Sequence, residues 1–205
     1  MTRILVVRHG QSEWNAEGRW QGQENPPLTA LGRQQAREAA RAVGAVDAIY
    51  ASPLERAATT AHLIAEETGV GPVVLLSGLM ERHAGVWQGL TRAQIEEAFP
   101  GYLDAGRRPP GWEDDAEVEA RVFEALWTIA SQHPGGHVLA VAHAGVIYAI
   151  ERMFGVEWER LANLGGRWVE LRDPDAPIKG EPLLDRWAIG ERVHLLIEET
   201  IPDQL

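Results

Sequence analysis

Short apolar runs alternate with amphipathic stretches along the chain. The runs predict buried strands at 4–7, 48–51, 73–76, 137–142 and 167–171, with two later runs also interpreted as strands. The stretches between them predict helices over 30–43, 53–68, 92–99, 115–132 and 146–154. Strands that alternate with helices predict an α/β fold. We expect a single three-layer domain over 1–205, with a mostly parallel central sheet flanked by helices on both faces.

Capping residues mark the starts of several helices. Thr29 is expected to cap the helix that follows it. Ser52 as N-cap, Pro53 at the first helical position and Glu55 three residues after the cap fit a capping box. Arg56 would then lie in the first turn, just beyond a strand and at the helix end that favours anions.

Two Gly- and Pro-rich segments, 16–27 and 101–114, separate the predicted elements. The first is long for a connection, and long ordered loops are often binding loops. Between them, Thr91 and Gln94 form a capping box that predicts the start of a short helix. We therefore expect these loops to border a ligand site.

The composition is typical of a globular protein and excludes several kinds of site. The 205 residues are 45% apolar and 24% charged, and there is no cysteine, which excludes disulfides and thiolate sites. No apolar run approaches the ~18 residues of a membrane span, and Met1 leads directly into the first strand without a signal peptide. We expect a cytoplasmic protein with no membrane partner.

The formal charge of −11 argues against a nucleic-acid partner. In such an acidic chain, arginines gathered at one point indicate an anion site. Arg8 and His9 directly follow the first strand, and His143 follows the strand at 137–142. Ligands of open α/β sheets bind outside the carboxyl ends of the strands.

Arg8, His9, Arg56 and His143 at one edge of the sheet would suit a phosphoryl group. Guanidinium forks match phosphate oxygens, and an imidazole can attack phosphorus as a nucleophile.

A metal site is the first alternative, because His9, His83, His143 and Glu81 are ligand types. None of these residues has the i, i+4 helical spacing, and nearby arginines would repel a metal ion. We expect no metal and no cofactor.

Arg8-His9-Gly10 with Ser12 and Asn15 resembles the motif Arg-His-Gly-x-Ser-x-x-Asn of the histidine phosphatase superfamily, also called the phosphoglycerate-mutase-like family. The resemblance extends in the family's order over roughly residues 3 to 150. It includes Gln21-Gly22, Leu28-Thr29, Gly32, Ser52-Pro-Leu-x-Arg56-Ala-x-x-Thr60-Ala, Glu81 with Gly85, Trp87 and Gly89, and Ala142-His143-Ala-Gly145.

The resemblance implies a role for each matching position. His9 would be the nucleophile that becomes phosphorylated. Arg8, Arg56 and His143 would hold the phosphoryl oxygens and stabilise the transition state. Glu81 would protonate the leaving alkoxide and then activate water.

Further positions would line the phosphate and substrate side of the pocket: Asn15, Gln21, Gly22 and Ala144. Arg107 and Arg108 are similar to a substrate-binding arginine pair in the mutase branch, but a solvated loop accounts for them equally well. His83 is expected to be structural or to lie at the rim of the pocket.

Two branches of the family remain open. Glu81-Arg82-His83 resembles the mutases, which need a doubly phosphorylated primer, whereas His143-Ala-Gly-Val146 differs from their His-Gly-Asn-Ser. The chain is also shorter than typical mutases. We interpret it as a phosphomonoesterase for small substrates, with a phosphoglycerate mutase as the alternative. A non-catalytic binding module of the same fold is a further alternative, and a homodimer is a family-level expectation.

Overall fold

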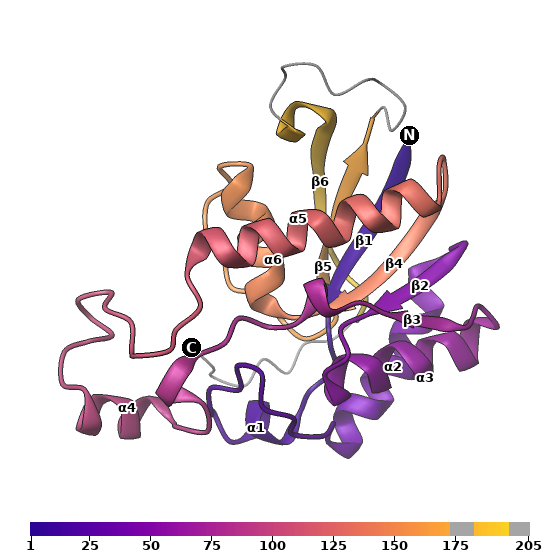
Figure 1. Cartoon of the computed structure of the whole chain (residues 1–205). Coiled ribbons are helices and arrows are strands. Elements are labelled where there is room, and N and C mark those ends of the chain that lie inside the picture. The colour runs from indigo at the N-terminus through magenta and orange to yellow at the C-terminus, as the bar shows by residue number, and fades with distance from the viewer. Residues whose placement is uncertain (173–182, 197–205) are drawn as a thin grey trace.

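Six strands form one sheet in the order β3-β2-β4-β1-β5-β6 in the computed structural model, which describes residues 1–172 and 183–196 (Figure 1). The strands are β1 (Thr2–Arg8), β2 (Ala48–Ala51), β3 (Val73–Leu75), β4 (His137–Ala142), β5 (Gly165–Leu171) and β6 (Trp187–His194). β3, β2, β4 and β1 pair in parallel, whereas β5 is antiparallel to both of its neighbours. The predicted mostly parallel sheet is confirmed.

Helices cover both faces of this sheet. They are α1 (Glu13–Ala16), α2 (Ala30–Val43), α3 (Glu55–Thr68), α4 (Arg92–Ala98), α5 (Asp115–Gln132) and α6 (Ala144–Met153). Alternate residues of β1 face opposite layers: Ile4 and Val6 pack in the core beneath α5 and α6, and Leu5 and Val7 pack against α2 and α3 (Figure 1). The predicted three-layer α/β class is confirmed. The predicted span of 1–205 includes residues 173–182 and 197–205, which lie outside the described residues.

The start of α3 differs from the prediction. The helix begins at Glu55 with Leu54 as its N-cap, and no side chain caps it. The Ser52 hydroxyl accepts from the backbone N–H of Leu54 at 3.2 Å and contacts Nε2 of His143 at 2.8 Å. The predicted capping box was wrong because this hydroxyl is used by a buried histidine. Arg56 still lies in the first turn of the helix.

Other boundaries follow local signals. Thr29 caps α2, and Thr91 with Gln94 forms the capping box of α4, as predicted. α1 was not predicted, although Ser12 and Asn15 form its capping box. α6 begins at Ala144, two residues earlier than expected. The apolar runs after residue 171 contribute to β6 as far as its end at residue 194.

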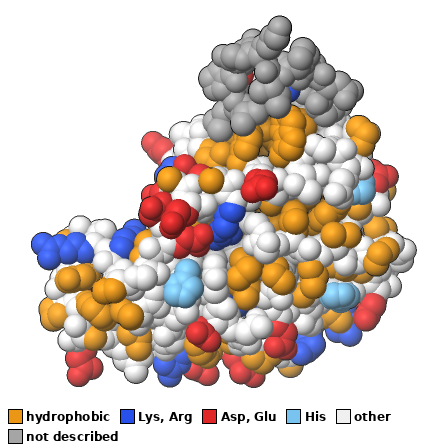
Figure 2. Space-filling view, viewed as in Figure 1, with side chains coloured by type: hydrophobic (Ala, Val, Ile, Leu, Met, Phe, Trp, Pro, Cys, Tyr) orange, Lys and Arg blue, Asp and Glu red, His pale blue; other side chains and the backbone are white. Residues whose placement is uncertain are grey.

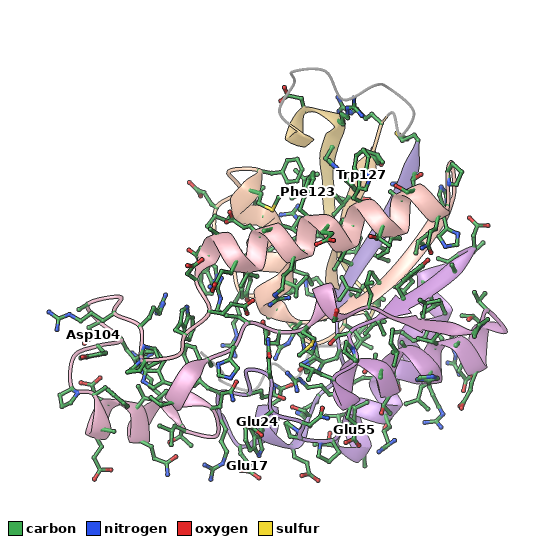
Figure 3. All side chains as sticks on the ribbon, in the orientation of Figure 1. Glu17, Glu24, Glu55, Asp104, Phe123 and Trp127 are labelled. Atoms are coloured by element: carbon green, nitrogen blue, oxygen red, sulfur yellow. The ribbon has the colours of Figure 1, made fainter. Side chains whose placement is uncertain are left out.

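An aromatic cluster ties the loops beyond the sheet to one another. The ring of Trp87, fully buried, lies edge-on to those of Trp20 and Trp112, with centroids 5.4 Å and 5.8 Å away. These rings come from the two long loops and the segment between them, so they fix one wall beyond the strand ends. α4 and the loop after it extend outward from this wall, with Asp104 at their outer edge (Figure 3).

Two tryptophans in the second half of the chain differ in burial. Trp187 is buried and packs edge-on against Phe123 of α5, which Figure 3 labels together with Trp127. Trp158, in contrast, is 68% exposed. Among residues 1–172 and 183–196, no helix has the length and apolar character needed to cross a membrane.

Candidate active site

The register of the two central strands brings two histidines together. Arg8 of β1 lies opposite Ala142 of β4, so His9 and His143 follow at adjacent strand ends. The N–H of His9 donates to the carbonyl of Ala142 at 3.1 Å. The two imidazole rings have centroids 5.1 Å apart and an interplanar angle of 63°. Both rings are buried, which makes this strand edge a water-poor site.

The contacts of His9 define its tautomer. Its Nδ1 lies 2.6 Å from the carbonyl oxygen of Gly10, which can only accept, so Nδ1 carries the hydrogen. Its Nε2 therefore has the free lone pair, and Nε of Arg56 donates to it at 3.2 Å. Burial and the guanidinium groups of Arg56 and Arg8 hold the pKa of His9 well below its usual value. The ring is neutral near pH 7, with Nε2 available as a nucleophile.

Glycines allow the turn after His9 to pack against helix α2. A Cβ atom on Gly10 would collide with the carbonyl of Gly32, and one on Gly32 would collide with the backbone of Gln11. The N–H of Gly10 also donates to the Thr60 hydroxyl at 3.1 Å. That hydroxyl donates to the carbonyl of Arg56 at 2.7 Å, which joins the turn to α3.

Arg56 is fully buried, and backbone carbonyls hold its guanidinium. Its two terminal nitrogens donate to the carbonyls of Glu24 at 2.6 Å and Gly22 at 2.8 Å. Burial lowers the pKa of Arg56 to about 10, so the group is still a cation at neutral pH. Figure 3 labels Glu24 in the loop that supplies these carbonyls. This fixed cation is preorganised next to the His9 lone pair.

Arg8 is half-buried at the end of β1. Its guanidinium donates to the carbonyl of Leu161 at 2.7 Å. Burial lowers the pKa of Arg8, while Tyr148 and Glu81 act in the opposite direction. A second held guanidinium therefore lies on the other side of the strand end from α3.

Within the described part of the chain, His143 has a hydrogen-bond partner at one ring nitrogen and none at the other. Because the Ser52 hydroxyl already accepts from Leu54, its hydrogen can be donated to Nε2 of His143. The hydrogen of the imidazole then lies on Nδ1, which is buried and has no hydrogen-bond partner among the described residues. Burial, Arg56 and His9 hold the pKa of His143 well below its usual value. An anion oxygen at the site would satisfy this buried donor.

Glu81 is held at the pocket by two backbone donors. Its carboxylate accepts from the N–H of Arg82 at 2.7 Å and from that of Gly145, in the first turn of α6, at 3.2 Å. A Cβ atom on Gly145 would collide with this carboxylate. Glycine is therefore required at position 145 if Glu81 is to keep its place.

A pocket of about 400 Å³ lies at this edge. It brings together most of the residues singled out in the sequence: Arg8, His9, Asn15, Gln21, Gly22, Arg56, Glu81, Arg108 and Ala144. His143 is not in the lining, although its ring centroid lies 5.1 Å from that of His9. Arg107 is not in the lining and lies over the ring of Tyr102 instead, 5.6 Å from its centroid. His83 is also outside it and contacts the backbone of Gly85 and Gly111.

Positive charge dominates the mouth of the pocket. Seven arginines and two carboxylates line the whole pocket: Arg8, Arg19, Arg56, Arg82, Arg108, Arg152 and Arg160, with Glu81 and Asp115. Asp115 pairs with Arg82 at 2.7 Å and Arg152 at 3.3 Å. Acidic and basic side chains lie side by side over the amino-terminal part of α5 in Figure 2. The guanidinium of Arg108 lies over the ring of Trp112, 4.9 Å from its centroid.

Sequence reasoning missed several pocket residues. Tyr148, Trp158 and Arg160 line the pocket, but they belong to α6 and the segment after it, where no motif pointed. Asn163 was also missed, and its side-chain amide donates to the carbonyl of His9 at 2.9 Å and to Oδ1 of Asn15 at 3.3 Å. The sequence could have indicated these residues only through their location in the chain. They lie in α6, which begins in the site, or between α6 and β5, which pairs with β1.

The described residues contain no group of three or more His, Cys, Asp or Glu side chains placed to hold a metal ion. The site is instead built from guanidinium groups, imidazoles and backbone amides. Such a site at the carboxyl ends of parallel strands defines a class of α/β proteins that bind phosphoryl groups.

Residues 4–171 match the profile of the Histidine phosphatase superfamily (branch 1), and the chain belongs to this family. It is 38% identical to a metal-independent phosphoserine phosphatase of Arabidopsis thaliana, over 73% of this chain and 67% of the relative. It is 35% identical to a glucosyl-3-phosphoglycerate phosphatase of Mycobacterium tuberculosis, over 85% and 87%. The structure of a mycobacterial glucosyl-3-phosphoglycerate phosphatase complexed with VO3 superposes with a TM-score of 0.75 at 32% identity, covering 82% of this chain and 92% of the other.

Proposed function

We propose that the protein is a metal-independent phosphomonoester hydrolase that works through a phosphohistidine on His9. The observation that carries this proposal is the contact between Nδ1 of His9 and the Gly10 carbonyl, which puts the lone pair on Nε2, where the fixed guanidinium of Arg56 donates to it. The named relatives support the reaction class, because they are phosphatases and one is called metal-independent.

In the first step, Nε2 of His9 attacks phosphorus. The N–P bond forms as the bond from phosphorus to the ester oxygen breaks, and Glu81 donates a proton to that oxygen. Arg8 and Arg56 bind the equatorial oxygens and stabilise their charge. For this, Nε of Arg56 turns its hydrogen bond from the His9 lone pair to the phosphoryl group. His143 donates from Nδ1, the buried hydrogen that otherwise has no acceptor among the described residues.

In the second step, water replaces the histidine. The Glu81 carboxylate accepts a proton from water, whose oxygen bonds to phosphorus while the N–P bond breaks. Inorganic phosphate leaves, and the neutral tautomer of His9 is restored. The backbone donors from Arg82 and Gly145 keep the Glu81 carboxyl at the pocket in both steps.

The pocket mouth supports small phosphomonoesters that carry a second anionic group. Arginines outnumber carboxylates in the lining, and both named relatives act on substrates that bear a carboxylate. Asn15, Gln21, Gly22 and Ala144 would contact the phosphate side, and Arg108 would contact the rest of the substrate. Arg107 would stay outside the site. No cofactor is required.

A phosphoglycerate mutase is the second candidate. Arg108 favours it, because the arginine of the mutase-like pair that lines the pocket could bind a carboxylate. A mutase would return the phosphoryl group from His9 to another hydroxyl of the substrate instead of to water.

One experiment separates these reactions. The purified protein is incubated in EDTA with phosphoserine, glucosyl-3-phosphoglycerate and 3-phosphoglycerate, the last with and without 2,3-bisphosphoglycerate. We expect free phosphate and no primer-dependent 2-phosphoglycerate, together with acid-labile phosphoprotein in quenched samples. His9→Ala should remove hydrolysis and labelling, whereas His62→Ala, on the exposed side of α3, should leave both unchanged. Rapid primer-dependent isomerisation, or loss of activity in EDTA, would overturn the proposal.

A further inference from the structure

A buried carboxylate of α6 binds two arginines of the sheet. Glu151 of α6 is 2% exposed. Arg167 of β5 contacts its Oε1 at 2.9 Å, and Arg192 of β6 contacts Oε1 and Oε2 at 2.7 Å each. One carboxylate with two guanidinium groups has a spare positive charge, so each arginine needs further acceptors.

The two arginines find these acceptors in different places. Arg167 donates to the carbonyl of Gly190 at 3.0 Å, within the sheet. Arg192 donates to the carbonyls of Glu159 at 2.8 Å and Arg160 at 3.4 Å, and contacts the Glu159 carboxylate at 3.1 Å. Among the contacts of the described residues, those of Arg192 connect the buried carboxylate to the segment 159–161, whereas those of Arg167 do not.

That segment forms part of the pocket and holds a proposed phosphoryl ligand. Arg160 and Leu161 line the pocket. The carbonyl of Leu161 accepts from Arg8 at 2.7 Å, and its N–H donates to the Tyr148 hydroxyl at 2.9 Å. The backbone at position 161 is thus fixed by α6 on one side and fixes Arg8 on the other.

We propose that Arg192 is a positioning residue for catalysis, which sets the place of the 159–161 backbone and, through the Leu161 carbonyl, of the Arg8 guanidinium. The proposal rests on the proposed function, in which Arg8 binds the phosphoryl group. Arg192 does not touch substrate. It acts by joining three elements, α6, β6 and the 159–161 segment, into one rigid support for the end of β1.

Arg167 provides a matched control, because it binds the same carboxylate without contacting the segment. Arg192→Ala and Arg167→Ala should both lower the melting temperature, since each removes one cation from Glu151, and Arg192→Ala should lower it more because its bonds to residues 159 and 160 are lost as well. Arg192→Ala should lower kcat/KM by about 10- to 100-fold, the scale expected for a small misplacement of a catalytic group. Arg167→Ala should stay within about 2-fold of the unmodified protein. Arg192→Lys keeps the charge without the forked guanidinium, so its kcat/KM should lie between those of the two alanine variants. It replaces Arg192→Ala in the test if Arg192→Ala does not fold.

A double-mutant cycle tests the route through Arg8. In an Arg8→Ala background, adding Arg192→Ala should cause little further loss of vanadate affinity, although alone it weakens vanadate by about 10-fold. Additive losses would overturn the proposal, as would equal kinetic effects of Arg167→Ala and Arg192→Ala.

Hydrogen exchange separates this proposal from the proposed function. Arg192→Ala should speed exchange at the amides of 159–163, and Arg167→Ala should not. If the unmodified protein hydrolyses no ester, the proposed function fails, while faster exchange with weaker vanadate binding would still support the positioning role. Unchanged exchange in Arg192→Ala would overturn the positioning role whatever the activity.

Discussion

Two parts of the pocket are built in different ways. We call the buried part around His9 and Arg56 the base, and the exposed part around Arg108, Asp115 and Trp158 the mouth. At the base, Arg56 is 0% and His9 is 2% exposed, and backbone carbonyls or neighbouring side chains hold their nitrogens. At the mouth, Trp158 is 68% exposed and arginines pair with exposed carboxylates or lie over aromatic rings. The base therefore has one geometry that suits a phosphoryl group, whereas side chains at the mouth can change without unfolding the protein. Reaction type belongs to the base and substrate choice to the mouth.

The largest effect should come from the base. Arg56→Ala should lower kcat/KM by about 10³-fold, because a fixed guanidinium beside the reacting phosphorus is lost. Arg56→Lys should recover little of this, since an ammonium group cannot donate to two carbonyls and the phosphoryl group in the same fork geometry. Steady-state kinetics with phosphoserine would measure both. A lysine variant close to full activity would show that charge alone is needed at the base.

Low pH should destabilise the folded protein through the two histidines at the base of the pocket. The folded-state pKa values of His9 and His143 are held well below the ordinary 6.5 by burial and by Arg56 and Arg8. The unfolded chain takes up these protons below about pH 6.5 and the folded chain does not. The free energy of unfolding should therefore fall as pH decreases below about 6.5, by about 1.4 kcal/mol per pH unit for each histidine.

Urea unfolding between about pH 5.5 and 7.5 measures this slope. His143→Gln should reduce it by about half, because one of the two depressed groups is removed. His62→Ala should not change it, since His62 is exposed. An equal slope in all three proteins would mean that other groups cause the acid effect.

Gly145→Ala tests whether the position of the Glu81 carboxylate matters for proton transfer to the leaving group. The added methyl group collides with Glu81, so hydrolysis of alkyl phosphates should fall by about 10- to 100-fold. The kcat/KM for p-nitrophenyl phosphate, which reports formation of the phosphohistidine and not its later hydrolysis, should fall much less, because this leaving group needs no proton. Glu81→Gln should give the same dependence on the leaving group. Equal losses for both esters would contradict a role for Gly145 in placing a general acid.

The smallest effect should come from the mouth. Trp158→Ala should raise KM by about 2- to 10-fold for glucosyl-3-phosphoglycerate, which is large enough to reach the exposed indole. Phosphoserine should keep its KM, and kcat should not change for either ester. Trp158→Phe should restore most of the affinity. A uniform loss of kcat would show that the mouth contributes to the chemical step.

The same division explains what could be predicted from the sequence. His9, Arg56 and His143 directly follow strands or begin a helix, so strand register alone places them at one edge. Ser52 was misassigned because a serine before a helix usually caps it, and nothing local signals a buried histidine 91 positions away. Arg107 and Arg108 could not be separated, because the direction of a side chain on a long loop depends on what it packs against. Asn163 and Arg160 lie in the stretch after α6, where no motif is found, and the Arg160 carbonyl accepts from Arg192, which is 32 positions away in the sequence.

Nδ1 of His143, which has no partner among the described residues, has a consequence for the stability of the protein in solution. A folded chain that keeps a buried donor and two clustered guanidinium groups is less stable than it would be with an oxyanion among them. Inorganic phosphate, the product of the proposed reaction, supplies such an oxyanion. Where phosphate accumulates, bound phosphate would make the protein more resistant to heat and to proteolysis, and it would also slow turnover by occupying the site. The phosphate concentration would therefore set the ratio between a stable, inhibited form and a less stable, active form.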